Sequence, residues 1–231
     1  MIYVTGDLHG WHDIHKLNTK NFPEQKTMTK DDFVIIAGDF GLVWNNSDAE
    51  LYWRNWLAER NFTTLVVDGN HENHDLLNLY PVHTWNGGKV HFISDNNIIH
   101  LMRGQIYEIQ GLKFFTFGGG VSIDRLARTP GVTWWAQEMP TYGEYNEGLA
   151  NLERHNWSVD IIVTHECSEI MYTELTKYSI GMYKYSNPLR DFFDELEEKV
   201  SFTQWNFGHY HSDVQLDEKH TLLYQMIELI I

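Results

Sequence analysis

"IYVTGDLHG", residues 2–10, joins a short apolar run to an aspartate and a histidine placed directly after it. The run predicts a buried strand that ends near Gly6, which puts Asp7 and His9 at its carboxyl end. Two later stretches, residues 31–40 and 62–70, repeat the arrangement, with a glycine beside a polar residue near each end. Their nearly continuous apolarity is typical of strands covered on both faces of a sheet.

Predicted helices separate these strands. Residues 47–60 begin with a Ser-Asp cap and carry apolar residues at helical spacing, and residues 11–20 also predict a helix. Strands alternating with helices imply parallel neighbours joined by right-handed crossovers. The alternation resumes toward the end of the sequence, with helices expected at 146–156 and 187–200 and strands at 159–166, 201–211 and 221–231.

The middle of the sequence has a different pattern. Residues 89–120 predict several short strands separated by turns, which favours an antiparallel or mixed sheet. Residues 118–147 show no clean period and predict an irregular loop insert, and long loops in compact domains are often functional. We therefore expect one α/β domain, residues 1–231, with two packed mixed β-sheets flanked by helices.

Composition narrows the function classes. Of the 231 residues, 42% are hydrophobic, which is enough for a substantial core, and the formal net charge is −15. This acidic balance makes nucleic acid an unexpected partner, because phosphate backbones are bound by Lys and Arg. The single cysteine, Cys167, excludes an intrachain disulfide, and no stretch resembles a signal peptide or a membrane span. The expectation is a cytoplasmic protein without a membrane partner.

Polar motifs follow five predicted strands. In an open α/β sheet the carboxyl ends of the strands face a common crevice where ligands bind. The residues that would meet there are two aspartates, one asparagine and five histidines: Asp7, His9, Asp39, Asn70, His71, His165, His209 and His211. Such O and N donors suit Mn, Fe, Zn or Ni. Most of these motifs are weak evidence alone, since a turn explains them too, and only GHYH is a moderate metal signal. Five motifs in chain order favour two metal positions, bridged by the carboxylate of the central Asp39.

The ordered set GDLHG, GDFG, GNHE, THE and GHYH, residues 6–211, resembles the calcineurin-like metallophosphoesterases. The resemblance implies a four-layer α/β sandwich with a dinuclear metal centre. It assigns the first metal to Asp7, His9, Asp39 and His211, and the second to Asp39, Asn70, His165 and His209. It makes His71 the general acid. The implied reaction is in-line attack by a metal-bridging hydroxide on a phosphomonoester or phosphodiester, either a small molecule or a nucleotide.

Two positions depart from the pattern of the family's protein phosphatases. Leu42 stands where they carry an aspartate that orients the catalytic histidine, and Asp68 stands where they carry an arginine. These differences disfavour a phosphoprotein substrate and leave His71 without an assigned partner. Arg125 and Arg128, inside the irregular loop, are candidates for phosphate binding, because Arg recognises phosphate with two parallel N–H groups. Their alternative role is a surface salt bridge.

Three alternative functions remain open at this point. A nuclease or a protein phosphatase of the same family would use the same metal centre on a larger substrate. A non-catalytic metal-binding scaffold would bind the ions and recruit a partner protein. The presence of every expected ligand and of His71 favours the enzyme, while the oligomeric state is undetermined by the sequence.

Overall fold

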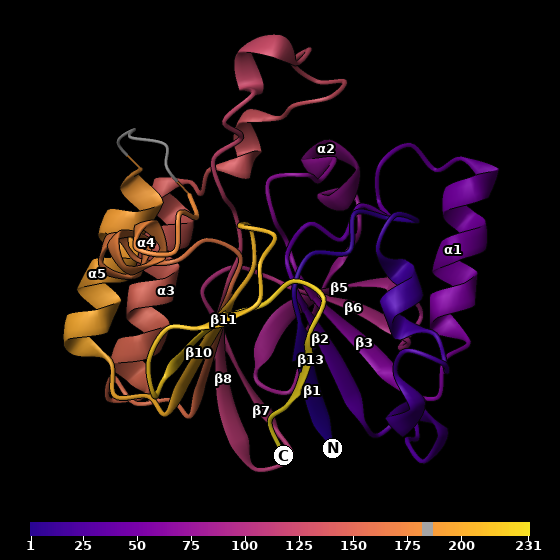
Figure 1. Cartoon of the computed structure of the whole chain (residues 1–231), viewed down its shortest axis with the longest axis horizontal. Coiled ribbons are helices and arrows are strands. Elements are labelled where there is room, and N and C mark those ends of the chain that lie inside the picture. The colour runs from indigo at the N-terminus through magenta and orange to yellow at the C-terminus, as the bar shows by residue number, and fades with distance from the viewer. Residues whose placement is uncertain (182–186) are drawn as a thin grey trace.

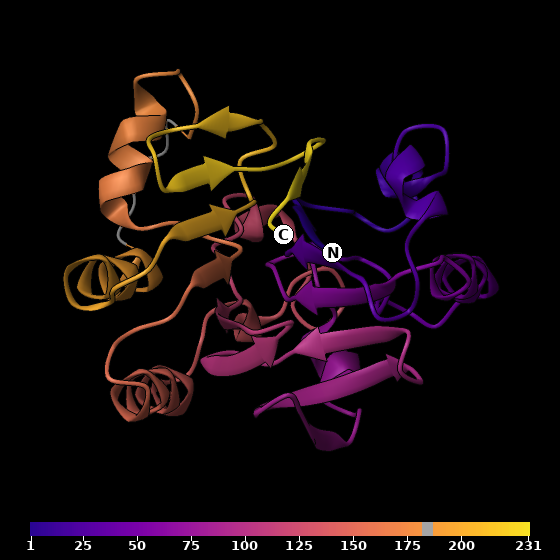
Figure 2. The ribbon, with the colours of Figure 1, turned by 90° about the horizontal axis from the view of Figure 1, so that it is seen from below.

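The structure, a computed structural model, describes residues 1–181 and 187–231. Two β-sheets pack face to face, and helices cover the outer face of each (Figures 1 and 2). Helices α3 (Tyr142–Arg154), α4 (Glu169–Thr176) and α5 (Pro188–Lys199) lie outside one sheet, and α1 (Asp48–Ala58) lies outside the other. The predicted four-layer α/β sandwich with two mixed sheets is confirmed.

The first sheet contains seven strands in the order β13-β1-β2-β3-β6-β5-β4. Its centre, from β1 to β6, is parallel; β13 and β5 pair antiparallel with the two sides of this centre, and β4 pairs antiparallel with β5. The strands are β1 (Ile2–Thr5), β2 (Phe33–Ala37), β3 (Thr63–Val67), β4 (Val82–Trp85), β5 (Gly88–Ser94), β6 (Ile98–Leu101) and β13 (Ile227–Leu229). The β4 strand was missed in the sequence, since its side chains are mostly exposed and show no apolar alternation.

The second sheet contains six strands in the order β11-β12-β10-β9-β8-β7. Strands β8, β9, β10 and β12 are parallel, while β7 and β11 pair antiparallel at the two edges. The strands are β7 (Gln105–Ile109), β8 (Leu112–Phe117), β9 (Ile161–Thr164), β10 (Gln204–Phe207), β11 (Val214–Gln215) and β12 (His220–Leu222). Both sheets therefore end their parallel strands at one common edge.

Alternate residues of one strand reach two different cores. Ile35 and Ala37 of β2 pack between the sheets, whereas Val34 and Ile36 face the outer layer with Leu57 of α1. A strand buried on both faces needs apolar residues at every position, and this explains the continuous apolar run in the sequence. A third core joins the second sheet to α3, α4 and α5 through residues such as Phe193.

The helix predicted for residues 11–20 is wrong: the chain forms only a 3₁₀ turn, η1 (Ile14–Leu17). Asn18 ends it in an extended conformation, and its side-chain oxygen accepts hydrogen bonds from the backbone N–H groups of Lys20 and Asn21. Asn side chains compete with the helix in this way by offering the backbone a local partner. A second 3₁₀ turn, η2 (Pro23–Lys26), follows.

Capping explains two other helix boundaries. Ser47 accepts a hydrogen bond from the backbone N–H of Glu50 and starts α1, as the sequence predicted. The helix expected from residue 146 begins earlier, at Tyr142, because Thr141 and Glu144 form a capping box. The short α2 (His74–Leu77) and α4 were not expected from the sequence.

The irregular loop projects beyond the edge at which the parallel strands end (Figure 1). It contains two 3₁₀ turns, η3 (Arg125–Ala127) and η4 (Ala136–Glu138), and a bridge between Pro130 and Trp134. Asp75 fixes its return limb by accepting hydrogen bonds from Trp135 and Gln137, both at 2.9 Å. Among the described residues, the helices are too short or too polar to cross a bilayer.

Candidate metal centre

The seven residues expected to bind metal lie together at the carboxyl ends of five parallel strands. Because β1, β2 and β3 are neighbours in one sheet and β9 and β10 in the other, the facing sheets bring their exit loops together. The residues contributed, in strand order, are Asp7 and His9, Asp39, Asn70, His165, and His209 with His211. This is the crevice at which open α/β sheets bind ligands.

One group of side chains matches the first predicted metal position. Ligand atoms of Asp7, His9, Asp39 and His211 all lie within 4.8 Å of one another. The Nε2 atom of His9 lies 3.4 Å from Asp39 Oδ2, and the imidazole rings of His9 and His211 meet edge-on with centroids 4.8 Å apart. Four donors from three loops at this spacing could hold one divalent ion.

The residues of the second predicted position lie on the other side of Asp39. His165 Nε2 lies 3.3 Å from Asp39 Oδ1 and 3.1 Å from Asn70 Oδ1. The ring of His209 lies 4.8 Å from that of His165. The two Asp39 oxygens thus point to different histidines, His9 and His165, and one carboxylate could serve both positions.

A buried oxygen without a partner supports a bound cation. Asp7 is fully buried, and its Oδ2 atom accepts no hydrogen bond, although Nε2 of His211 lies 3.1 Å away. An unsatisfied buried carboxylate oxygen is costly, and a divalent ion would satisfy it. The other oxygen, Oδ1, accepts the backbone N–H of His209 at 2.9 Å, which fixes the carboxylate in place.

Several of the predicted ligands have a strained backbone. His9, Asp39, His209 and His211 adopt left-handed φ angles of 45°, 45°, 73° and 47°. Residues other than glycine rarely adopt this conformation, and such strain clusters where a ligand site requires a side chain to point in one direction. Four of the seven predicted ligands share it.

Two glycines allow the exit loops to approach closely. A Cβ atom on Gly69 would lie 2.1 Å from Asp39 Oδ1, and one on Gly38 would lie 1.9 Å from His165 Nδ1. Gly38 also has a φ of +100°. Any side chain at these positions would displace the Asp39 and His165 groups of the predicted metal positions.

The two carboxylates dominate the electrostatics. Burial opposes the charged forms of His9 and His165. The nearby carboxylates of Asp39 and Asp7 outweigh burial and raise the pKa of His9 to about 9 and that of His165 to about 10. At His209 burial is the largest influence, and it lowers the pKa of this residue to about 4. The field of the Asp7 and Asp39 pair therefore favours positive charge beside it, which divalent ions could supply.

A second layer of polar groups orients the ligands. His9 Nδ1 lies 3.1 Å from Asp13, and His165 Nδ1 lies 2.9 Å from the backbone oxygen of Ala37. The Asn70 amide donates to the hydroxyl of Ser122, which leaves its carbonyl oxygen facing His165. Partners of this kind set the tautomer and direction of metal-binding histidines.

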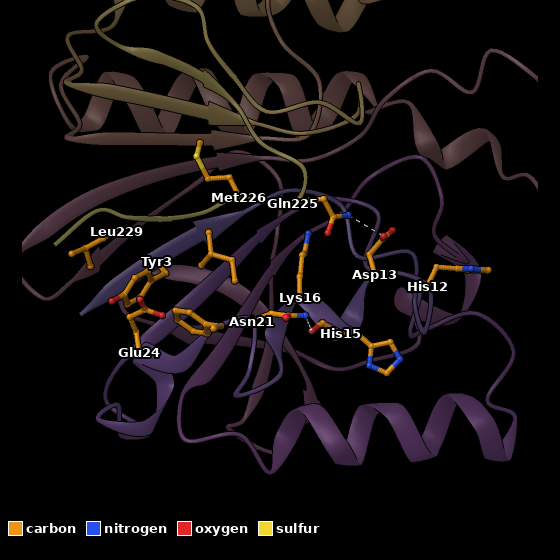
Figure 3. A pocket seen from close by; sticks show the side chains of 12 residues that line it. Tyr3, His12, Asp13, His15, Lys16, Asn21, Glu24, Gln225, Met226 and Leu229 are labelled. Carbon is orange, nitrogen blue, oxygen red and sulfur yellow. Dashed lines mark hydrogen bonds between the residues drawn. The ribbon is translucent and has the colours of Figure 1, made fainter.

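Lys16 stabilises the backbone of the loop that follows β1. Its ammonium group is buried and donates to the backbone oxygens of Gly6, Asp7 and Tyr224 at 2.9, 2.7 and 2.6 Å. Figure 3 shows Lys16 pointing toward the segment that contains Gln225, inside a cavity of about 760 Å³. Sequence reasoning missed this residue, since a lysine in a polar segment carries no sign of burial.

His71, the predicted acid, lies at the rim of the site. Its ring centroid is 5.6 Å from that of His9, and the guanidinium of Arg128 lies 3.2 Å from its Nε2 atom. Three carboxylates lie near His71 in the sequence, but among the described residues none of them hydrogen-bonds the His71 ring. Instead, Glu72 accepts backbone N–H groups, Asp68 pairs with Arg103, and Asp75 binds the loop.

The two arginines of the irregular loop differ in position. Arg128 lines a cavity of about 400 Å³ together with Asp39, Asn70 and His71, whereas Arg125 has an exposed side chain and lines neither this cavity nor the larger one beside it. Asp124 accepts from Arg128 Nε at 2.7 Å and holds its side chain over the site. The same cavity is lined by the fully buried Arg190 of α5, which sequence reasoning missed.

Comparison with known proteins identifies the family. No curated protein matches the chain. The sequence model of the calcineurin-like phosphoesterases, however, matches residues 1–213, which include all seven predicted metal ligands and His71. Members of this family act on phosphorylated substrates, and the cluster of Asp7, His9, Asp39 and His211 is a possible metal-binding site. The chain belongs to the calcineurin-like phosphoesterase family.

Proposed function

We propose that this protein is a dinuclear metal-dependent phosphoesterase that hydrolyses a phosphomonoester or phosphodiester of a small molecule or nucleotide. The observation that carries the proposal is the meeting of seven residues with O and N donors, Asp39 central among them, at the ends of five strands. The net charge of −15 supports a small substrate over a nucleic acid, which would need a basic surface.

The two proposed ion positions share Asp39. Asp7, His9 and His211 complete the first, and Asn70, His165 and His209 complete the second. Divalent ions such as Mn²⁺ bound there would offset the two carboxylates, stabilise the charge of a phosphoryl group and lower the pKa of water. A hydroxide formed from that water would attack phosphorus in line with the leaving oxygen. The leaving oxygen then needs a proton.

His71 supplies that proton in our proposal. It stands outside both ligand sets and lines both cavities beside the centre, where a leaving group can reach it. Its backbone N–H donates to Asp39 Oδ1 at 2.7 Å, so its position is tied to the centre itself. Arg128, next to the His71 ring, is placed to bind the phosphoryl oxygens.

The test is hydrolysis of p-nitrophenyl phosphate and bis-p-nitrophenyl phosphate by metal-stripped protein with Mn²⁺, Ni²⁺, Zn²⁺ or Mg²⁺ added back. We expect turnover that depends on the added metal, with the ratio of the two rates separating monoesterase from diesterase. Folded protein that binds two ions and hydrolyses neither ester with any metal would contradict the proposal and favour a metal-binding scaffold.

A further inference from the structure

A second cavity lies beside the predicted metal centre and shares His71 and His211 with the cavity that Arg128 lines. It has a volume of about 830 Å³ and lies between the loops that follow β1 and β2. His9, His71 and His211 form its floor. A group bound there would therefore be next to the proposed acid and to one proposed metal position.

One wall of this cavity is a tryptophan fixed in place. The backbone N–H of Trp44 donates to buried Glu50 at 2.9 Å, and its carbonyl accepts from the Asn73 side chain at 2.6 Å. Its ring meets Trp135 of the projecting loop edge-on, with centroids 5.0 Å apart. Two backbone hydrogen bonds and one ring contact therefore fix Trp44, and an aromatic residue fixed in this way is preorganised for contact through the rest of its ring.

Two further aromatic side chains contribute to the walls. Trp11 follows the predicted ligand His9 by two residues and lines the cavity, and its side chain is 52% exposed. The ring of Tyr224 stacks on His211 at 5.0 Å, and its hydroxyl donates to Asp13 at 3.2 Å. Exposed aromatic surface gathered in one cavity, with polar groups at its rim, is typical of a binding site rather than of ordinary surface.

The charges of the two cavities differ. Among the residues lining the larger cavity there is no lysine or arginine, and Glu50 is already occupied by backbone N–H groups of residues 44–46. The smaller cavity carries Arg128 and Arg190. Phosphoryl oxygens are thus suited to the smaller cavity, and an uncharged, flat group is suited to the larger one.

We propose that the cavity formed by Trp11, Trp44 and Tyr224 binds the nucleobase of a nucleoside phosphate whose phosphoryl group lies at the metal centre. This inference rests on the proposed function and names its substrate class. Every base presents a π-face that stacks on aromatic side chains. A base is favoured over a plain aryl ring because His12, Asp13 and Asn45 offer polar atoms to its edge.

The experiment compares binding of two ligands to the full-length, Mn²⁺-loaded protein by isothermal titration calorimetry. The ligands are the 5′-phosphonate analogues of AMP and of ribose 5-phosphate, in which a CH₂ group replaces the ester oxygen and prevents turnover. We expect the AMP analogue to bind the wild type at least about tenfold more tightly, which corresponds to about 1.4 kcal/mol.

Substitutions of the cavity's tryptophans test whether the base binds there. Trp11→Ala should weaken binding of the AMP analogue about tenfold and leave that of the ribose analogue within about twofold, and Trp11→Phe should restore it. Trp44→Leu should act in the same direction. Tyr142→Ala, which removes an aromatic side chain that is 82% exposed and outside both cavities, is the matched control and should change neither affinity.

Equal binding of the two analogues, equal weakening of both by Trp11→Ala, or no binding of either would overturn the nucleobase site. Hydrolysis of p-nitrophenyl phosphate decides the proposed function separately. Metal-dependent turnover without a preference for the AMP analogue would retain the phosphoesterase and reject the base site. Selective binding of the AMP analogue without turnover of any ester would retain the base site and reject the phosphoesterase.

Discussion

Arg103 binds Asp68 through two nitrogens, with Nε at 2.9 Å and Nη2 at 2.6 Å from the same carboxylate oxygen, Oδ2. Both side chains are buried, and His100 lies 3.2 Å from the other oxygen. Asp68 begins the turn that carries Asn70 and His71. The position at which related protein phosphatases carry an arginine is therefore used here to anchor that turn to the interior.

Replacing Asp68 by asparagine should destabilise the fold strongly. The substitution leaves the buried Arg103 guanidinium with the partly exposed Glu144, 3.6 Å from Nη1, as its remaining counter-charge, and breaking a buried pair costs about 3–5 kcal/mol. We expect a loss of this size in the free energy of unfolding, measured by urea denaturation of the metal-free protein.

The matched control is Glu174→Gln, which breaks the exposed ion pair between Glu174 and Lys177. Exposed pairs contribute about 0–1 kcal/mol, so this variant should unfold close to the wild type. Equal urea midpoints for the Asp68 and Glu174 variants would show that the Asp68 pair does not anchor the turn.

The fold was largely predictable because its strands are buried on both faces. Their apolar runs are unbroken, and each proposed ligand follows such a run directly, as Asp39 follows the run ending at Ala37. The parallel order of β1, β2 and β3 then brings the motifs together. Local sequence sufficed because strand, turn and ligand are contiguous in each motif.

Contacts between distant segments were not predictable. The Arg103 partner of Asp68 is 35 residues away, and the Arg128 neighbour of His71 is 57 residues away. Neither pairing leaves a local pattern, since only tertiary packing decides which of several nearby carboxylates and arginines meet. For the same reason the sequence did not separate Arg128, at the cavity, from Arg125, which is exposed.

Stability should depend on pH through His220. Burial opposes its charged form, but Glu197 and Asp217, which both lie within hydrogen-bond distance, raise the pKa of His220 above its ordinary value. A raised folded-state pKa adds stability that is complete below the unfolded-state pKa of about 6.5 and disappears as pH rises through the folded-state pKa.

Glu197→Gln should therefore destabilise the protein more at about pH 5.5 than at about pH 8.5, by about 1.5 kcal/mol, the scale of a hydrogen bond to a charged group. Urea unfolding at the two pH values measures the difference. Glu195→Gln, on the same helix, breaks an exposed pair with Lys199 that stays charged throughout this range, and its effect should not vary with pH. A pH-independent effect of Glu197→Gln would exclude the His220 pairing.

Asp39→Asn should weaken both proposed metal positions together. The two Asp39 oxygens face His9 on one side and His165 on the other, so loss of the carboxylate charge affects both. We expect the dissociation constant of each ion to rise at least about tenfold, measured by metal content after equilibrium dialysis. His211→Asn should weaken only the first position, and loss of a single ion from Asp39→Asn would refute the bridging role.

His71→Gln tests the proposed acid without removing a proposed ligand. Loss of general acid catalysis costs about 10²–10⁴ in rate, so kcat should fall by this factor while the metal content stays unchanged. The loss should be larger for phenyl phosphate than for p-nitrophenyl phosphate, because p-nitrophenolate leaves readily without a proton. The exposed His83 on β4, replaced by glutamine, is the control and should retain wild-type activity. Equal losses on the two esters would mean that His71 positions the substrate instead of protonating the leaving oxygen, and full activity would remove it from the reaction altogether.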